Sequence, residues 1–192
     1  MLIFEFMDKS RADELLPPLF KIMYANMDPI SPSGAGYEAD FAEWYGAVRP
    51  AVEKPAREVI RILRDGELVG FFQYYVNETT FMMEEIQLVP EARGQGVFEA
   101  LYDVLRAVVP EETPFVGAYA LRQNEKSQGI LRHLGLERIG EEKNCLHFRG
   151  SAKELFRVLG ESERFLPEYE IVCPGCGGDF AAYNSEKGPE EA

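Results

Sequence analysis

The 192-residue sequence has few cysteines, a shortage of positive charge and no long hydrophobic run. Its three cysteines, an odd number, fit no disulfide framework and suit a reducing compartment. Lys and Arg number 20 against 33 Asp and Glu, and the net charge of -13 argues against general nucleic-acid binding, because a phosphate backbone requires clustered cations. Since no apolar run reaches about 18 residues and the first residues do not form a signal peptide, we expect a cytoplasmic protein with no nucleic-acid and no membrane partner.

The rest of the composition is that of one globular domain with an acidic extension. Hydrophobic residues make up 46% of the chain and aromatic residues 12%, which is enough for one well-buried core. Residues 161–192 contain eight acidic residues against two basic ones, together with prolines and glycines. We therefore predict a domain over residues 1–160 and an acidic C-terminal tail over residues 161–192, which explains almost half of the charge imbalance.

One stretch, residues 84–98, organises the sequence. It begins as a buried strand that ends with apolar residues and a proline unable to donate a ladder hydrogen bond: Ile86, Leu88, Val89 and Pro90. Gly94 and Gly96 then remove side chains where the first turn of a helix exposes its unpaired N–H groups, so an anion such as a pyrophosphate can approach the backbone closely. An amphipathic helix follows over residues 97–109. The stretch predicts a cofactor phosphate site, with an ordinary glycine turn as the alternative.

The pattern Val-x-Pro-x-x-Arg-Gly-x-Gly-Val at this junction resembles the acetyl-CoA loop of the GNAT acyltransferases. The core pattern of that family is Gln/Arg-x-x-Gly-x-Gly/Ala. It aligns with six consecutive residues, of which the last, Phe98, departs from the pattern: Arg93, Gly94, Gln95, Gly96, Val97 and Phe98. The resemblance implies that acetyl-CoA is a cosubstrate whose pyrophosphate rests on the backbone of these six residues. It also implies that the pantetheine arm lies beside Leu88 and Val89 and is bonded by backbone N–H groups.

A second segment carries the same resemblance. Asn124 can cap a helix over residues 125–134, with Ser127, Ile130, Leu131 and Leu134 on its inward side. The GNAT pattern of Asn, a small residue three positions later and a closing Gly-Phe is matched by Asn124, Ser127 and Gly135-Leu136. The resemblance implies that Asn124 and Ser127 contact the pantetheine arm from the side opposite Leu88 and Val89.

The tyrosine that this GNAT pattern expects falls on Leu131, so no general acid can be carried over to that position. Two explanations stay open. In the first, no acid is needed, because a thiol with a pKa of about 8.5 leaves tolerably well as the thiolate. In the second, Tyr119 on the facing strand reaches the sulfur and protonates it.

Periodicity and turn residues predict the remaining elements. Residues 58–64 and 67–76, joined by Asp65-Gly66, form a hairpin with a two-residue primed turn. Helices are expected over residues 8–26 with an interruption at Pro17-Pro18, over residues 37–48 with a buried aromatic face ending before Pro50, and over residues 152–159. Strands are expected at 2–6, 81–89, 115–121, 136–140 and 145–149. With the resemblance, these elements predict an α/β (α+β) fold: a mixed, mostly antiparallel twisted sheet with helices on both faces, splayed between the central parallel strands at 81–89 and 115–121.

Two adjacent carboxylates, Glu84 and Glu85, are the candidates for the base that an amine acceptor requires. Strand alternation sends neighbouring side chains to opposite faces, so we expect at most one of the two to point into the cleft. Burial raises the pKa of a glutamate toward the range in which it can take a proton from an ammonium group. The alternative is that they form ion pairs with Arg57, Arg61 or Arg64, or lie at a solvated strand end.

A half-knuckle, Cys173-Pro-Gly-Cys176, is a candidate zinc site in the tail. Structural zinc takes four ligands, and Cys145 and His147 can complete a Cys3His set if the tail folds back. A ligand pair from a second subunit is another way to fill the site, and a simple glycine turn is the alternative without metal.

Taken together, the two segments predict an acetyl-CoA-dependent N-acyltransferase that transfers an acetyl group to a primary amine of a small molecule or peptide by direct attack on the thioester. The alternative is a non-catalytic CoA-binding or interaction module whose tail contacts a partner. Whether the protein is a homodimer is left open.

Overall fold

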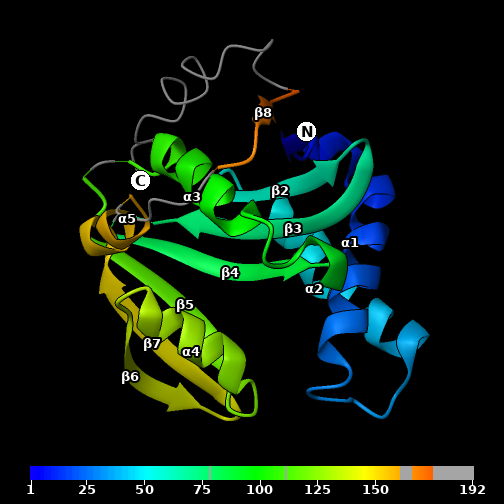
Figure 1. Ribbon diagram of the computed structural model, residues 1–192. Helices are drawn as coiled ribbons and strands as arrows, with labels where there is room; N and C mark the ends of the chain where they lie inside the picture. Colours follow the sequence, from blue (N-terminus) through cyan, green and yellow to red (C-terminus); the bar gives the residue numbers. More distant parts are fainter. Residues whose placement is uncertain (78, 111, 161–165, 175–192) are drawn as a thin grey trace.

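The computed structural model describes residues 1–77, 79–110, 112–160 and 166–174, and Figure 1 shows their arrangement. A mixed sheet of eight strands has the order β6-β7-β5-β4-β3-β2-β1-β8. Its strands are β1 Leu2–Phe6, β2 Arg57–Arg64, β3 Glu67–Val76, β4 Thr80–Leu88, β5 Phe115–Leu121, β6 Glu137–Glu142, β7 Cys145–Ser151 and β8 Tyr169–Val172. Only β4 with β5 and β1 with β8 pair in parallel among these strands, which confirms the predicted mixed, mostly antiparallel sheet.

Helices cover both faces of the sheet, as predicted (Figure 1). They are α1 Ala12–Met27, α2 Tyr37–Val52, α3 Val97–Val108, α4 Glu125–His133 and α5 Ala152–Gly160, with short 3-10 turns at Lys9–Arg11 and Pro90–Ala92. The larger core lies under α3, α4 and α5, where Leu101, Leu131 and Leu155 pack against strand residues such as Phe81 and Val116. No helix in the described ranges is both long and apolar enough to cross a membrane.

A smaller core lies on the opposite face, beneath α1 and α2. Leu15, Leu16 and Leu19 of α1 pack there with Val59 and Phe71 of the sheet. The expected helix break at Pro17-Pro18 is wrong, because α1 runs through both prolines. Buried leucines on either side of the pair hold the helix against one cluster, and this packing outweighs the lost backbone hydrogen bonds.

Helix α2 also departs from the prediction. It continues through Pro50 to Val52, and Val52 is its only buried residue. Its aromatic face is half-buried rather than buried, and Tyr37 keeps 37% of its surface exposed. The aromatic side chains of α2 are therefore only partly used by the core.

Local signals placed several elements correctly. Asp65 and Gly66 both have positive φ, as a type I′ turn requires, and β2 and β3 pair antiparallel across them. Strand β5 has the predicted bounds, and α3 ends one residue before the predicted position. The strand β8, which pairs with β1, was not predicted. The division of the chain into a domain over residues 1–160 and a tail over residues 161–192 stays a prediction.

Candidate functional site

The central strands β4 and β5 are paired over only part of their length. The pairing covers Thr80–Met83 with Phe115–Ala118, whereas β4 continues to Leu88 and β5 continues to Leu121. Beyond Met83 and Ala118 the two strands separate, which confirms the predicted splay. The second half of β4 is therefore bonded to a neighbouring strand only through β3.

The opening coincides with a β-bulge in β4. The register between β3 and β4 shifts between Gln73 and Tyr74, so that Gln73 is opposite Glu85 while Tyr74 is opposite Met83, and Glu84 is the extra residue. As a result both glutamates contact side chains on the α1 and α2 face of the sheet. The expectation that alternation would send Glu84 and Glu85 to opposite faces is wrong, because the bulge interrupts the alternation.

Glu84 is held by positive charge and hydrogen bonding. It forms an ion pair with Arg57 of β2 and accepts a hydrogen bond of 3.0 Å from Nε2 of Gln73. The guanidinium of Arg57 also lies over the ring of Tyr75, 5.2 Å from the ring centroid. The ion pair that was the alternative interpretation of Glu84 is therefore present, and the charge of this carboxylate is compensated.

Glu85 has no such cation among the described residues. Its Oε1 accepts a hydrogen bond of 2.5 Å from Gln87, whose own Oε1 accepts one of 2.8 Å from Asn26 of α1. Burial raises the pKa of Glu85 to about 7, the bond from Gln87 opposes this shift, and the nearby charge of Glu84 adds to it. Glu85 is thus a half-buried carboxylate that exchanges a proton near neutral pH.

The backbone of β4 presents alternate residues to the opening. The N–H of Val89 donates to the carbonyl of Val69 at 2.9 Å, so it faces β3 and is not available to a ligand in the splay. Because hydrogen-bonded and non-hydrogen-bonded pairs alternate in an antiparallel ladder, the backbone groups of Ile86 and Leu88 face away from β3. The Val89 N–H is therefore already used in the ladder, and the expected contact of a cofactor arm with Leu88 and Val89 stays a prediction.

The side chain of Arg93 contacts the end of β4 and does not point into the glycine loop. Its guanidinium donates to the carbonyl of Leu88 at 3.0 and 3.2 Å and to Oδ1 of Asn26 at 2.5 Å. Its backbone N–H donates to Pro90. The side chain therefore ties the strand end to α1, and the free N–H groups begin at Gly94.

The glycine loop itself leads into α3 with its donors open. Gly94 and Gly96 have φ of 71° and 74°, a left-handed conformation that favours glycine. The N–H groups of Gly94, Gln95 and Gly96 have no acceptor among the described residues, and those of Val97 and Phe98 lie in the first helical turn, where no intrahelical acceptor exists. Five successive donors thus converge at a helix N-terminus, which suits a pyrophosphate.

Comparison with protein-family models gave no match, and no curated protein matched. Solved structures do match. An acetyltransferase from Thermus thermophilus has a TM-score of 0.61 at 12% identity, covering 79% of this chain and 97% of its own. The apo form of FdhC, a nucleotide-linked sugar GNAT, has a TM-score of 0.62 at 14% identity, covering 86% and 95%. The PaiA N-acetyltransferase from Thermoplasma acidophilum, in complex with coenzyme A, has a TM-score of 0.59 at 12% identity, covering 77% and 98%.

The chain has the GNAT fold. The second GNAT-like segment lies on α4, across the splay from β4. Oδ1 of Asn124 accepts a hydrogen bond of 3.1 Å from the N–H of Ser127, so the predicted cap is confirmed. Leu131, at the position of the GNAT tyrosine, is buried at 8% exposure in the larger core. The helix also buries Gln128, which was not expected, and leaves Ile130 exposed at 38%.

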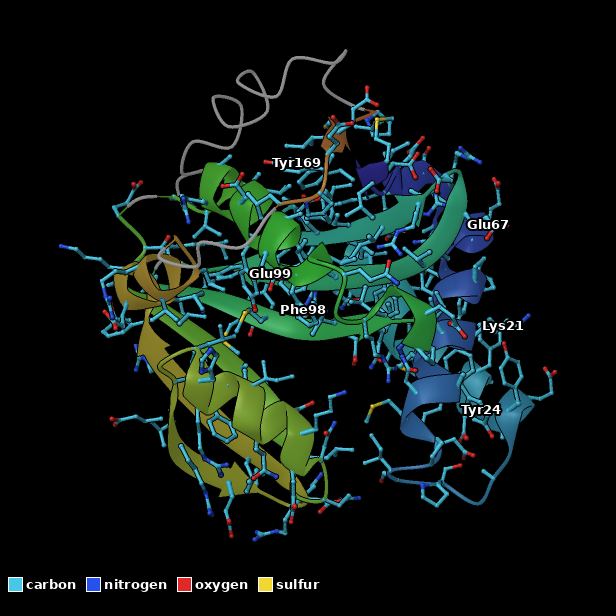
Figure 2. All side chains as sticks on the ribbon, viewed as in Figure 1. Lys21, Tyr24, Glu67, Phe98, Glu99 and Tyr169 are labelled. Atoms are coloured by element: carbon cyan, nitrogen blue, oxygen red, sulfur yellow. The ribbon has the colours of Figure 1, made fainter. Side chains whose placement is uncertain are left out.

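Phe98 at the start of α3 and Tyr119 on β5 have different surroundings. Phe98 is half-buried against the larger core and stacks on Tyr102 with ring centroids 6.2 Å apart, so it turns into the core beside the loop. Figure 2 labels Phe98 at the start of α3. Tyr119 is 50% exposed and packs edge-on against His147 with ring centroids 4.5 Å apart. Its proton-donating role stays a prediction.

The predicted Cys3His zinc site is not supported by the sheet order. Cys173 follows β8 at one edge of the sheet, whereas Cys145 and His147 lie on β7 near the other edge. Six strand spacings of roughly 4.8 Å separate β7 from β8, about 29 Å in all. No group of three or more metal-binding side chains occurs in the described residues. Cys173 is disulfide-bonded, so the expectation that the cysteines form no disulfide is wrong, and a disulfide sulfur is not the thiolate that zinc binds. Cys176 lies outside the described residues, so zinc bound by Cys173 and Cys176 stays a prediction that requires this bond to be reduced.

Sequence reasoning missed the polar network that surrounds the two glutamates. Gln73, Gln87 and Asn26 are spread over two strands and a helix, and no short motif joins them. A usable signal was present in β3 and β4, because Gln73 and Gln87 are amides with apolar residues on either side and both are buried. A buried amide requires partners, which here are the carboxylates of the bulge.

Proposed function

We propose that the protein is an acyltransferase that moves an acetyl group from acetyl-CoA to a primary amine by direct attack of the amine on the thioester. The observation that carries the proposal is Glu85, a half-buried carboxylate with a pKa of about 7 at the point where β4 and β5 separate. A base with a pKa near the working pH combines a useful deprotonated fraction with enough basicity to take a proton.

The residues around the opening fit acetyl-CoA. The open N–H groups from Gly94 to Phe98 suit its pyrophosphate, and the outward backbone groups of Ile86 and the outward N–H of Leu88 suit its amide-bearing arm, whereas the Leu88 carbonyl already accepts from Arg93 and Asn26. When bound, acetyl-CoA supplies an activated acyl carbonyl and a thiol leaving group. Coenzyme A in the structurally similar PaiA N-acetyltransferase supports this assignment. Contacts from Asn124 and Ser127 on the other side remain part of the proposal.

The two glutamates have different roles in this proposal. An amine attacks only in its neutral form, so a proton must leave the incoming ammonium, and Glu85 accepts it directly or through a water molecule. Glu84 forms an ion pair with Arg57, and its nearby charge adds to the rise that burial gives the pKa of Glu85. Gln87 and Asn26 hold the Glu85 carboxylate in place.

Leu131 of α4 cannot donate a proton to the leaving thiolate. Tyr119 is the remaining candidate for protonating the sulfur, on the strand that faces Glu84 and Glu85. Full activity of a Tyr119→Phe variant would show that the thiolate leaves unassisted.

Thermal unfolding with and without acetyl-CoA tests the cofactor site. A ligand that binds only the folded state stabilises it by about 2.7 kcal/mol at about 100 times its dissociation constant, so the melting temperature should rise clearly. Gly94→Glu places a negative charge where the pyrophosphate rests and should abolish the rise. Gly34→Glu is the matched control, because Gly34 also has positive φ and open space around it but lies in the segment between α1 and α2.

Release of CoA thiol with an amine panel then tests the chemistry. Acetyl-CoA-dependent stabilisation without thiol release above the hydrolysis background would favour a non-catalytic CoA-binding module, an interpretation consistent with the buried Leu131. Identical melting at millimolar acetyl-CoA would overturn both interpretations.

A further inference from the structure

The aromatic side chains that α2 leaves half-buried line a pocket against α1. Phe20, at 1% exposure, is its floor and contacts the rings of Tyr24 and Trp44 with centroids 5.7 and 5.3 Å away. The pocket has a volume of about 340 Å³, within the range of small-molecule sites. Figure 2 labels Tyr24 near the end of α1, beside the segment that leads to α2. In a packed core, neighbouring side chains would fill this space. Here the aromatic surface stays open and is available to a ligand.

The pocket is lined by negative charge without positive charge. Asp28, Asp40 and Glu43 are among its lining residues, and no Lys, Arg or His is. None of the three carboxylates forms an ion pair with another described residue. Asp40 accepts a hydrogen bond of 2.7 Å from Ser33, and burial together with the charges of Asp28 and Asp40 raises the pKa of the Tyr24 hydroxyl. Carboxylates beside aromatic faces attract an organic cation both by charge and by cation–π contact.

The pocket lies next to the opening in the sheet. Asn26, in the last turn of α1 that also provides part of the pocket, bonds to Gln87 and Leu88 of β4. Ser31, which lines the pocket, accepts a hydrogen bond of 2.9 Å from Gln123, in the segment between β5 and α4. The segment between α1 and α2 thus joins the pocket to both sides of the splay.

We propose that this pocket binds one ammonium group of a diamine acceptor whose other nitrogen is acetylated, an assignment that rests on the proposed acyl transfer. An ammonium held by carboxylates is harder to deprotonate, since nearby negative charge favours its charged form. The nitrogen in the pocket is therefore not the nucleophile. A second nitrogen, joined to the first by an apolar spacer that covers the aromatic walls, reaches Glu85 and gives up its proton there before it attacks the thioester.

Trp44 allows binding to be measured without acetyl-CoA, because it is the only tryptophan in the chain and it lines the pocket. Titration with 1,6-diaminohexane and with n-hexylamine should change its emission saturably, whereas hexan-1-ol should bind at least about tenfold more weakly for lack of a cation. Equal affinity for the alcohol and the two amines would overturn the assignment of a cation site.

Charge variants that keep the shape of the pocket test the carboxylates. Asp28→Asn with Asp40→Asn should weaken binding of 1,6-diaminohexane at least about tenfold. Glu38→Gln with Glu67→Gln is the matched control, because it removes two charges from exposed residues outside the pocket. An equal loss of affinity in the two double variants would show that binding depends only on the net charge of the protein. That result would overturn the assignment of this pocket as the cation site.

Turnover separates this proposal from the proposed function. n-Hexylamine should bind but be acetylated at least about tenfold more slowly than 1,6-diaminohexane, because its only nitrogen is held in the pocket. Equal rates for the two amines, with thiol release intact, would overturn the diamine assignment and leave the acyltransferase in place. Binding of both amines without acetylation of any amine would instead overturn the acyltransferase and leave the cation pocket in place.

Discussion

The two faces of the sheet are built differently. Under α3, α4 and α5 the core is continuous, and six residues of α3 alone are buried. Under α1 and α2 the apolar cluster is smaller, and beside it lie the carboxylates of the bulge, their amide partners and an open aromatic pocket. The comparison indicates that folding stability resides mainly on the first face, whereas the second is less fully packed and contains the candidate site.

The largest expected effect concerns the closed face. Leu101, in the middle of α3, is fully buried, and Leu101→Ala should lower the free energy of unfolding by about 2–5 kcal/mol in chemical denaturation. Phe41→Leu on the open face should cost less than about 1.5 kcal/mol, because Phe41 is only half-buried. Equal losses for the two variants would remove the distinction between the faces.

The next effect concerns catalysis. Glu85→Gln should lower kcat/KM about 100-fold, since general base catalysis is lost. In the wild type, activity should rise with pH through about 7 as Glu85 loses its proton, and the variant should lack this rise. Glu5→Gln removes another carboxylate of the same sheet, one that forms an ion pair with Arg61, and should retain the pH profile.

The raised pKa of Glu85 also has a consequence for stability. Because the folded-state pKa of about 7 exceeds the unfolded value of about 4.5, the folded protein prefers the protonated carboxyl, and this contribution to stability is lost as pH rises through about 7. Glu85→Gln should therefore melt higher than the wild type above pH 7 and show little difference near pH 5. A variant that melts lower at both pH values would contradict the burial cost assigned to Glu85.

A smaller effect is expected from the cation beside Glu84. Arg57→Gln leaves Glu84 uncompensated, so its charge should raise the pKa of Glu85 further and move the pH–rate profile upward by less than about one pH unit. Glu84→Gln should move the profile in the opposite direction. Shifts of the same sign in both variants would show that the pair does not tune Glu85.

The smallest effect concerns the contact across the opening. Gln123→Ala removes the bond to Ser31 and should raise KM for the amine less than about fivefold, with no change in melting temperature, because this hydrogen bond is exposed to solvent. Lys126→Ala, an exposed change in the first turn of α4, should leave KM unchanged. A large loss of kcat in Gln123→Ala would show that the contact does more than hold the segment between α1 and α2.

Elements with strong local signals were predictable from the sequence. The turn at Asp65-Gly66 follows from the positive φ that these two residues adopt. The loop before α3 was predictable in the same way, because Gly94 and Gly96 also have positive φ. The splay was predicted from the resemblance, and the parallel pairing of β4 with β5 from the nearly continuous apolar sequence of β5. These features depend on short segments, so a single sequence is sufficient to find them.

The remaining features depend on tertiary contacts. Pro17 and Pro18 suggest a helix break, yet packing of the flanking leucines keeps α1 continuous. The bulge that brings Glu84 and Glu85 to one face is a property of the register with β3, and nothing in the sequence of β4 alone shows it. The pairing of β8 with β1 likewise joins segments that are far apart in the chain.

The order of the strands also bears on how the molecule avoids extending its own sheet. A bare strand edge offers unpaired backbone groups to other chains and promotes aggregation. At one end, β8 covers β1, so that a four-residue strand is outermost among the described strands. At the other end, β6 carries Glu137, Arg138, Glu141 and Glu142, and such charges discourage further strands from adding. One edge is thus protected by a short strand and the other by charged side chains, and both features oppose the addition of strands from other chains.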